Sequence, residues 1–384
     1  MDSLGEGGAE QNLLTLVRRL RAPVCEHHLV WLYDDTALME AFRPHVGSML
    51  SLRAKRGIGL VGAAGRLAAH LRELRPDLVH AKLIRAQLVA RVAARLAGRL
   101  PVLTTWECLS YSSKMYVELG RRGPYLRAVT RALDATTGIT DRHFIAVSKQ
   151  VAEYNAKKLG VSASRVSVVY NAIEPDRIVD FDEEELASVR RGLDVGSGPL
   201  LLSVGRLVGQ KRHDVTIAAM PRILERHPTA TLLIAGGGSL ESDLQKQIVA
   251  LGVGANVRLL GARKDVPALL KLADLFVFPS DYEGLGIALM EALAAGLPVA
   301  ASHIPTSIEV AEGAGSVRYF EPGDSRGLAE AVIDTLSDLR ASKDVARTDA
   351  GSVQQRFSPE GMAAQFLTIA TRAADRRPRA RAPQ

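Results

Sequence analysis

The sequence predicts an α/β fold built from two doubly wound, Rossmann-like domains that face each other across a cleft. Short apolar runs alternate with longer amphipathic, Ala/Leu/Arg-rich runs through most of the 384 residues. This alternation is typical of parallel strands covered by helices on both faces. It stops once, in residues 173–198, which are acidic, then glycine-rich, and lack a strand pattern. Because the chain is longer than one usual domain, we place the domain boundary in this interruption.

Each half of the chain supplies apolar runs that predict strands. In the first half they are HLVWLY, DLVH, PVLTT, HFIAVS and RVSVVY, and in the second half LLLSV, TLLIA, VRLL, LFVFP and PVAAS. We therefore expect a first domain over residues 1–175 and a second over residues 176–357. An amphipathic helix is expected over residues 358–376, and residues 377–384 are expected to form a disordered basic tail.

The start of the chain departs from this alternation. Gly7 and Gly8 open a helical run, Ala9–Leu20. A glycine-rich loop that opens a helix usually follows a buried strand, yet only six residues precede Gly7 and none reads as a strand. Either the first strand of the N-terminal sheet is missing, through a start site placed too far downstream, or the sheet begins one strand later. We favour the missing strand.

Composition and cysteine content are those of a soluble globular protein. The chain is 47% hydrophobic and 24% charged, which is ordinary for that class. Its two cysteines, Cys25 and Cys108, are too few for a disulfide framework and favour a reducing cytosol. No Cys/His cluster predicts a metal site. The apolar stretch Met49–Leu74 is interrupted by Arg53, Lys55, Arg56 and Arg66, so no transmembrane segment is expected.

The net charge of +7 is unevenly distributed. Residues 1–180 carry 26 Lys/Arg against 17 Asp/Glu, whereas residues 181–369 are net acidic. A basic N-terminal half could attract anionic membrane lipid or an acidic acceptor; the alternative is a solvated arginine-rich surface. A nucleic-acid partner is not expected, because aromatic residues are 5% of the chain and no recognition module is visible.

The segment Asp274–Ala301 carries the clearest chemical pattern. A buried strand, LFVF, runs into the loop SDYEGLG and then a helix over Ile287–Ala295, which Gly296 should terminate. Glu283 lies in the loop and Glu291 within the helix. A helix N-terminus suits phosphate, and carboxylates accept hydrogen bonds from sugar hydroxyls. The arrangement therefore fits a diphosphate between two sugars. Alternatively, Glu291 is a partly buried helix residue and Glu283 a surface loop residue.

Two further segments favour a diphosphate site. SVGRLVGQKR, residues 203–212, follows a strand and places the cations Arg206 and Lys211 beside a turn at Gly205. LIAGGGSL, residues 233–240, is a strand followed by glycines that begin at Gly236. Each segment alone is weak, because basic loops and glycine turns are common.

Together these segments resemble the family 4 (group 1) retaining glycosyltransferases, which have the GT-B fold. The family's E-x7-E is matched by Glu283 and Glu291 in EGLGIALME. Its other motifs are matched by GGAE at Gly7–Glu10, NAIE at Asn171–Glu174, GRL with a following lysine at Gly205–Leu207 and Lys211, and PGD at Pro322–Asp324. The resemblance covers nearly the whole chain, from Gly5 to about Ala374. E-x7-E alone is not specific, but five motifs in the family's order are.

The resemblance implies an acceptor in the N-terminal domain and a nucleotide sugar in the C-terminal domain. Glu283 would lie by the donor sugar, Arg206 and Lys211 would bind the diphosphate and stabilise the leaving charge, and Glu291 would bind the ribose. The backbone of Gly284, Leu285 and Gly286 would assist, Gly205 and Gly236 would shape the donor loops, and Gly7 and Gly8 would approach the phosphates. The last helix would cross back to the first domain. No cofactor or metal is implied; the substrate would be a UDP- or GDP-linked sugar.

The acceptor side departs from the family pattern. Many members carry a histidine where this chain has LTTWEC, and the family's HAH is His80–Ala81–Lys82 here. His80, Lys82, Trp106 and Glu107 are therefore the acceptor-side candidates. Lys82 and Glu107 could pair, or one could contact the acceptor; alternatively, Trp106 packs and Glu107 is solvated. An Asp-x-Asp at Asp180–Asp182 lies in the interdomain segment and is interpreted as a chance match.

The expected function is retaining transfer of a hexosyl unit from a nucleoside diphosphate sugar to a hydroxyl acceptor. The acceptor would be a sugar, polysaccharide or lipid-linked molecule in polysaccharide or glycolipid synthesis. The expected location is cytoplasmic, with peripheral attachment to the inner face of the membrane. One alternative is another nucleotide-sugar enzyme on the same scaffold, an epimerase or hydrolase. A second is a catalytically impaired sugar-binding module.

Overall fold

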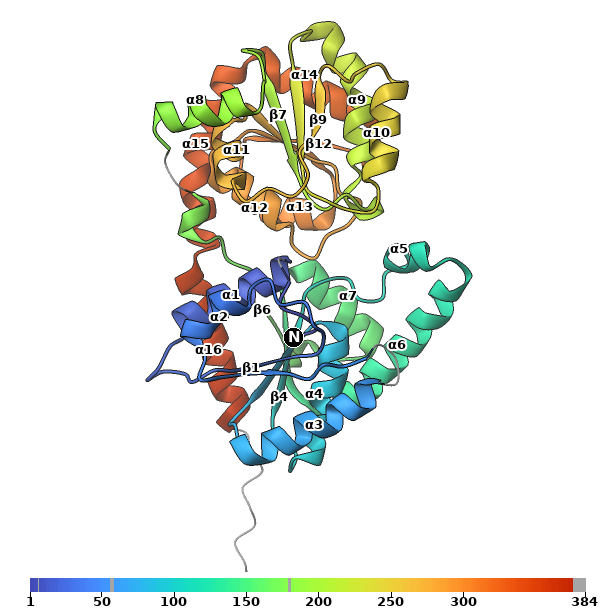
Figure 1. The fold of residues 1–384 in the computed structure, drawn as a ribbon, viewed down its shortest axis with the longest axis vertical. Helices are drawn as coiled ribbons and strands as arrows, with labels where there is room; N and C mark the ends of the chain where they lie inside the picture. Colours follow the sequence, from blue (N-terminus) through green and yellow to red (C-terminus); the bar gives the residue numbers. More distant parts are fainter. Residues whose placement is uncertain (6, 56–58, 179–180, 376–384) are drawn as a thin grey trace, which may run out of the picture. The chain divides into compact units, whose positions relative to one another are not determined.

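The computed structural model describes residues 1–5, 7–55, 59–178 and 181–375 (Figure 1). Two compact units divide the chain. Unit 1 contains Met1–Ala172 and the residues from Pro359 onward, and unit 2 contains Ile173–Ser358. The boundaries expected from the sequence were 175/176 and 357/358. The proposed tail over residues 377–384 lies outside the described residues. Each unit is described below by itself.

Unit 1 contains two separate parallel sheets. Sheet A pairs β1 (His28–Trp31) with β2 (Ser48–Ser51). Sheet B has the order β3-β4-β5-β6, with strands at Val79–Lys82, Val102–Trp106, Asp141–Ala146 and Val166–Val168. All five strands expected here are present, and β2 is an addition. No strand precedes the first helix in the described part of the chain, and sheet A has two strands there.

The helices of unit 1 cover both faces of these sheets. Leucines of α1 and phenylalanine and methionine of α16 share one core cluster with β1. Apolar residues of α3 and α4 form a second cluster with Leu32, Leu52 and Ala81. The main helices are α1 (Gly8–Arg19), α3 (Gly59–Leu74), α4 (Ile84–Leu96), α6 (Gly123–Thr137), α7 (Lys149–Leu159) and α16 (Pro359–Asp375); α2 (Met39–Phe42) and α5 (Ser113–Tyr116) are short. The C-terminal helix therefore packs in unit 1, against α1.

Unit 2 is a six-stranded parallel sheet with the order β12-β11-β10-β7-β8-β9. Its strands are β7 (Leu200–Val204), β8 (Thr231–Ala235), β9 (Val257–Leu259), β10 (Leu275–Phe278), β11 (Val299–Ser302) and β12 (Val317–Phe320). Its helices are α8 (Glu183–Gly192), α9 (His213–Arg226), α10 (Glu241–Ala250), α11 (Val266–Leu272), α12 (Ile287–Ala294), α13 (Pro305–Val310), α14 (Ser325–Ser337) and α15 (Leu339–Arg356). β12 was not expected from the sequence; the other five strands were.

The strand order of unit 2 reverses between β7 and β10. The chain runs outward from β7 to β9 on one side, and from β10 to β12 on the other. In such sheets ligands bind outside the carboxyl ends of the strands at this switch point. The two loops that leave β7 and β10 there are the segments that carry Arg206, Lys211 and Glu283. The fold thus brings together two motifs that lie about 70 residues apart in the sequence.

Local signals explain several helix ends. Gly296 has a left-handed φ of 75°, its N–H donates to Leu293 O at 3.0 Å, and it follows the last turn of α12, so the predicted stop is confirmed. Asp182 is the N-cap of α8, where its carboxylate accepts from Glu185 N at 2.8 Å. Asp182 therefore has a structural role in the Asp-x-Asp segment, and Asp180 lies outside the described residues.

None of the helices in the described part of the chain is both long enough and apolar enough to cross a bilayer.

Candidate functional site

The loops after β7 and β10 are joined at a buried ion pair. Lys211, at the end of a short 3₁₀ turn over Gly209–Lys211, places its Nζ 2.6 Å from Glu283 Oε1. Gln210 Nε2 donates to Glu283 Oε2 at 3.2 Å and to Tyr282 O at 2.8 Å. The Glu283 side chain is 8% exposed. Glu283 is therefore not the solvated surface residue that one interpretation of the sequence allowed.

Arg206 supplies a second cation on the same loop. Its side chain is exposed, and within the described residues its guanidinium has no ion-pair partner. The next residue, Leu207, is fully buried and fixes the turn to the core of unit 2. The loop thus carries one lysine in an ion pair and one exposed arginine that has no ion-pair partner among the described residues. This charge pattern is suited to a diphosphate.

Two glycines allow the β7 loop to pack on the loop after β8. Gly205 N donates to Ala235 O, and Leu207 N donates to Gly237 O, both at 3.0 Å. Gly236 has φ of 151°, and a Cβ there would stand 1.9 Å from Gly205 O. No side chain fits at Gly236 without moving one loop away from the other. Gly205 and Gly236, both singled out in the sequence, therefore allow the backbones of the two loops to lie in close contact.

The N-terminus of α12 lies directly after the Glu283 loop. Gly286 caps the helix in the left-handed region, with φ of 89°, and no side chain caps the first turn. Gly284 and Leu285 are buried beside it. The first backbone donors, from Ile287 onward, are the groups that a helix N-terminus offers to phosphate. Glu291 is half-buried on the second turn of this helix.

His213 was missed by sequence reasoning. It is 3% exposed, and its Nδ1 and Nε2 lie 3.3 Å from Ser203 Oγ and from Gly205 O. Burial lowers the pKa of His213 to about 4, so the ring is neutral at pH 7. A neutral imidazole can bridge the strand end and the glycine turn without adding charge.

Arg212 was also missed. It has a left-handed φ of 49° and pairs with Asp214 at 3.0 Å and with Asp281 at 3.2 Å. Asp281 N in turn donates to Gln210 O at 3.0 Å. These contacts hold the two loops together next to Lys211 and Glu283. Asp281 lies 69 positions from Arg212, so no local spacing could have indicated their contact.

The PGD segment caps a helix beside this group. Asp324 is the N-cap of α14 and accepts from the backbone N–H groups of Arg326 and Gly327, both at 3.0 Å. A Cβ at Gly323, which has φ of 85°, would stand 3.3 Å from Arg212 Nη1. The segment therefore borders the loop contacts, and its left-handed φ favours glycine at this position.

Unit 1 holds the acceptor-side candidates. Lys82 Nζ lies 2.7 Å from Glu107 Oε1, with side chains 5% and 8% exposed, so their pairing is confirmed and a solvated Glu107 is wrong. Lys82 Nζ also donates to Ala9 O at 3.4 Å. Nearby Glu10 is buried, and burial raises the pKa of its carboxyl. The pair is closed off from solvent.

Trp106 and His80 are also interior groups. Trp106 is 1% exposed and stacks on Phe144 with ring centroids 4.6 Å apart, as the packing interpretation expects. His80 Nε2 shares a hydrogen bond of 2.8 Å with Thr105 Oγ1, and its ring lies 4.8 Å from that of Phe366. Burial lowers the pKa of His80 well below its usual value.

Gly7 and Gly8 open α1 in unit 1. Gly7 is the N-cap, and a Cβ there would stand 2.5 Å from Glu10 Oε2. The role suggested for these glycines toward a bound donor stays a prediction.

Two family descriptions match this chain in succession. Glycosyltransferase Family 4 matches residues 6–177, and Glycosyl transferases group 1 matches residues 189–349. The second match contains the Lys211, Glu283 and Glu291 segments described above.

Similar proteins agree with these matches. An uncharacterized glycosyltransferase of Methanocaldococcus jannaschii is 31% identical over 66% of this chain and 66% of its own length. The Escherichia coli UDP-Gal:alpha-D-GlcNAc-diphosphoundecaprenol alpha-1,3-galactosyltransferase is 28% identical over 61% of this chain and 59% of its own. The chain thus spans slightly less than two thirds of the length of these relatives.

The fold is shared with solved structures. The crystal structure of HepE from Anabaena in complex with UDP superimposes with a TM-score of 0.82, at 20% identity, over 97% of this chain and 98% of that one. The five sequence motifs, the two parallel-sheet units and these matches point to one family. The chain therefore belongs to the family 4, group 1 glycosyltransferases and has the GT-B fold.

Proposed function

We propose that this protein transfers a hexosyl unit from a nucleoside diphosphate sugar to a hydroxyl acceptor, with retention of anomeric configuration and without a metal ion. The observation that carries the proposal is the Lys211–Glu283 pair at the switch point of unit 2, 2.6 Å apart beside the N-terminus of α12. A lysine ammonium has three donors. One can stay on Glu283 while the others bind phosphate oxygens.

Different residues of this site would bind different parts of the donor. Arg206 and Lys211 balance the diphosphate charge that grows as the sugar–phosphate bond breaks, so no divalent cation is required. Glu283, fixed by Lys211 and Gln210, accepts hydrogen bonds from the sugar hydroxyls, and Glu291 accepts from the ribose. Gly284, Leu285 and Gly286 contribute backbone to the phosphate end. Rigid loops hold these groups in place before the donor arrives.

The proposed chemistry takes place on one face of the sugar. The bond from C1 to the diphosphate oxygen breaks, and the acceptor oxygen bonds to C1 from the same side. The acceptor proton passes to the departing phosphate oxygen. Atoms and charge balance without a protein nucleophile, and the configuration at C1 is kept. The products are the glycosylated acceptor and a nucleoside diphosphate.

A UDP-linked donor is favoured over a GDP-linked one. The Escherichia coli relative uses UDP-Gal by its name, and the Anabaena structure contains UDP. We extend the nucleotide, and not the sugar, from those proteins to this one.

We further propose a lipid-linked or polysaccharide acceptor reached at an anionic membrane surface. One part of unit 1, here called the α6 surface, exposes apolar side chains on α5, α6 and the turn between them. Its members are Met115, Val117, Tyr125, Leu126, Val129 and Leu133. Exposed cations in the same segment include Arg121, Arg122 and Arg131. An apolar stripe flanked by arginines is the composition that binds membrane interfaces.

The transfer proposal is tested with UDP- and GDP-hexoses, simple glycoside acceptors and a polyprenyl-diphosphate-linked sugar, each with and without EDTA. We expect a product whose new linkage has the donor's anomeric configuration by NMR, at an unchanged rate in EDTA. An inverted linkage, or activity that EDTA abolishes and a divalent cation restores, would contradict the proposed route. Sugar release or epimerisation without any acceptor would favour the alternative chemistry.

The membrane proposal is tested by vesicle co-sedimentation. The chain should bind phosphatidylglycerol vesicles, bind phosphatidylcholine vesicles weakly, and lose binding as salt rises. Leu126→Asp together with Val129→Asp should release it, whereas Val249→Asp, at an exposed apolar position of unit 2, should not. Equal binding by both variants would show that the α6 surface is not the contact.

A further inference from the structure

Unit 1 contains a polar cavity between α5, α6 and α7, here called the α6–α7 cavity. Its volume is about 310 Å³, and the pockets that bind small ligands usually begin at about 300 Å³. The cavity is lined by side chains that can donate hydrogen bonds and by few apolar ones. The polar lining consists of Tyr111, Ser113, Arg127, Arg131, Tyr154 and Lys158.

Three cations meet in this cavity without a counterion. Arg127 and Arg131 lie one turn apart on α6, and Lys158 lies one turn after Tyr154 on α7. Lys158 Nζ is 5.5 Å from the centre of the Tyr154 ring, and none of the three cations forms an ion pair within the residues that the structure describes. The described lining also contains no carboxylate. Because like charges repel, an anion in the cavity would lower its free energy.

Buried contacts fix the wall of the cavity at Tyr111. The Tyr111 side chain is 2% exposed, and its hydroxyl donates to Asp134, which pairs in turn with the buried Arg91. Asp134 is therefore bound to Arg91 and Tyr111, and is not a partner of the cations in the cavity. Burial raises the pKa of Tyr154, and the charge of Arg127 opposes the increase, which places Arg127 near the Tyr154 hydroxyl. A ligand would meet donors that are held in place before it binds.

The α6–α7 cavity borders the apolar α6 surface. Helix positions i and i+4 share one stripe, and three such stripes lie side by side along α6. In order around the helix they are Arg127 with Arg131, Pro124 with Ala128, and Tyr125 with Val129. The first two stripes line the cavity, and the third belongs to the exposed α6 surface. A molecule that joins an anionic group to an apolar chain matches this order of side chains.

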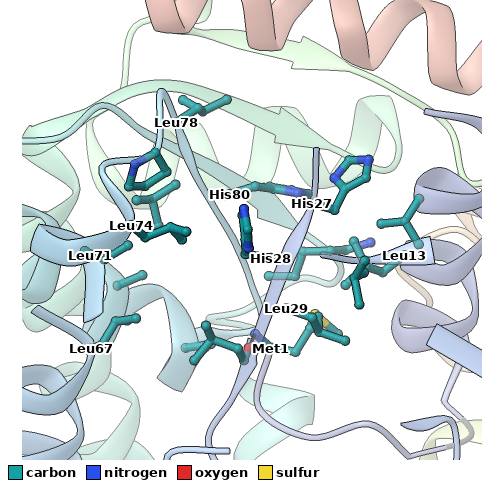
Figure 2. A pocket seen from close by; sticks show the side chains of 18 of the residues that line it. Met1, Leu13, His27, His28, Leu29, Leu67, Leu71, Leu74, Leu78 and His80 are labelled. Atoms are coloured by element: carbon teal, nitrogen blue, oxygen red, sulfur yellow. Dashed lines mark hydrogen bonds between the residues drawn. The ribbon is translucent and has the colours of Figure 1, made fainter. Parts of the chain in front are cut away.

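A second cavity of unit 1, of about 230 Å³, has a different lining. Figure 2 shows leucines of α3 on one side, Leu13 of α1 on the other, and the His80 ring between them. Lys82 also lines this cavity, but it is paired with Glu107. An apolar cavity whose lysine is already paired does not suit an anion. Of these two cavities, the α6–α7 cavity is the one suited to a phosphate group.

We propose that the α6–α7 cavity binds the diphosphate of a lipid-linked sugar acceptor, and that the adjoining α6 surface contacts the start of the lipid chain. The inference rests on the proposed transfer to a lipid-linked acceptor. Arg127 and Arg131 offer forked donors to the diphosphate oxygens, and Lys158 adds a point charge. A diphosphate between sugar and lipid carries more negative charge than the phosphodiester of a membrane lipid. Three cations therefore favour the acceptor over the surrounding headgroups.

Calorimetric titration with geranyl diphosphate tests the location of the site. Excess UDP is present throughout to occupy the donor site of unit 2. The cavity variant is Arg131→Gln/Lys158→Gln. The control variant, Arg95→Gln/Lys157→Gln, removes the same charge from exposed positions of unit 1 outside this cavity. The cavity variant should bind about tenfold or more weakly than the wild type, and the control should match the wild type. Equal affinity in all three proteins would overturn the proposal.

Thermal unfolding separates a binding role from a structural one. The Tm of the cavity variant should equal or exceed that of the wild type, because two like charges are removed from one place. A lower Tm together with weaker binding would assign these cations to folding and overturn the proposal.

Matched probes identify the ligand. Methyl diphosphate has the same head group as geranyl diphosphate but lacks the apolar chain, and dihexanoyl phosphatidylglycerol presents a membrane headgroup. The wild type should bind geranyl diphosphate about tenfold more tightly than either probe. Equal binding of methyl diphosphate would indicate a site for free phosphate compounds, and equal binding of the phosphatidylglycerol a headgroup site. Either result would overturn the proposal.

Transfer kinetics test the cavity in the reaction itself. With a polyprenyl-diphosphate-linked sugar as acceptor, the cavity variant should raise KM about tenfold and leave kcat unchanged. With a simple glycoside acceptor, its kcat/KM should match that of the wild type. An equal loss with both acceptors would show that these cations do not recognise the diphosphate and would overturn the proposal. If no acceptor is turned over by any of the proteins, the transfer proposal fails, and the titrations still decide whether the cavity binds a lipid diphosphate.

Discussion

Each unit contains a buried Lys–Glu pair, and the two pairs have different surroundings. Lys211–Glu283 in unit 2 and Lys82–Glu107 in unit 1 are 2.6 and 2.7 Å long, and both glutamates are 8% exposed. Lys211 remains 17% exposed and stands beside an open helix N-terminus, whereas Lys82 is 5% exposed and bonds to a backbone carbonyl. We therefore expect the pair in unit 2 to bind a ligand and the pair in unit 1 to stabilise a core, because their neighbours differ.

Charge separates the two pairs further. Burial raises the pKa of the Glu10 carboxyl, and the nearby charges of Glu107 and Asp2 raise it further, whereas Lys82 lowers it. The region around Lys82 is therefore rich in carboxylates and unsuited to phosphate. Lys211 shares its loop with Arg206 and is followed by Arg212. A diphosphate is expected to prefer unit 2 for this reason.

The largest effect is expected from Lys211→Ala. Loss of a charge that stabilises the leaving diphosphate should lower turnover by about 10³-fold, equivalent to about 4 kcal/mol. Tm should also fall, because Glu283 is 8% exposed and loses its cation, so turnover is measured below the Tm of the variant. Steady-state kinetics with the donor found active measures it. Lys246→Ala is the matched control, because Lys246 is 75% exposed on α10 and should be neutral. Equal activity in the two variants would remove Lys211 from the mechanism.

Lys82→Met should act on stability instead. Removing one partner of a buried pair leaves Glu107 charged and unpaired, which costs about 3 kcal/mol. The Tm should fall by about 10 °C. The double variant Lys82→Met/Glu107→Leu should recover most of this loss of Tm. If the single variant keeps its Tm but loses acceptor turnover, Lys82 contacts the acceptor and the contrast between the two pairs fails.

Gly236→Ala should separate the two loops that shape the donor site. The clash with Gly205 O and the left-handed φ predict a loss of about 2 kcal/mol of stability, together with weaker donor binding. Gly237→Ala is its neighbour-matched control, because a Cβ there meets nothing within 4 Å. Calorimetric unfolding and donor titration of both variants provide the comparison. Identical behaviour would mean that the loop contact does not matter for the site.

The smallest effect concerns pH and His213. Its pKa is about 4 in the folded chain, against an ordinary histidine pKa of 6.5. The unfolded chain therefore binds the proton first, so the stability that neutral His213 contributes is present above pH 6.5 and is lost as pH falls toward 4. Between pH 6 and 5 the stability advantage of the wild type over His213→Leu should shrink by about 1.4 kcal/mol. A pH-independent difference would contradict a buried neutral ring.

The buried central strands of the sheets could be predicted from the sequence better than the strands at the sheet edges. Strands such as LFVF of β10 are buried along their whole length and leave an uninterrupted apolar run. The two strands that were not expected, β2 and β12, lie at sheet edges. β2 is half-buried throughout, and the middle of β12 is exposed. An edge strand needs no continuous apolar run, so periodicity alone did not identify them.

The candidate site could be predicted only in part, for a related reason. Glu283 and Lys211 are visible as motif residues, but their contact spans 72 positions. The roles of Gln210, Arg212 and His213 depend on how two loops meet at the sheet's switch point. Such contacts arise from the tertiary fold and leave no local spacing in the sequence.

The central claim is that unit 2 holds a nucleotide sugar through Lys211, and a thermal-shift panel tests it most directly. Wild type and Lys211→Ala are each unfolded with UDP- and GDP-linked hexoses. A donor at 100 times its dissociation constant should stabilise the wild type by about 2.7 kcal/mol and leave Lys211→Ala nearly unchanged. Equal shifts in both proteins, or no shift with any nucleotide sugar, would contradict the claim.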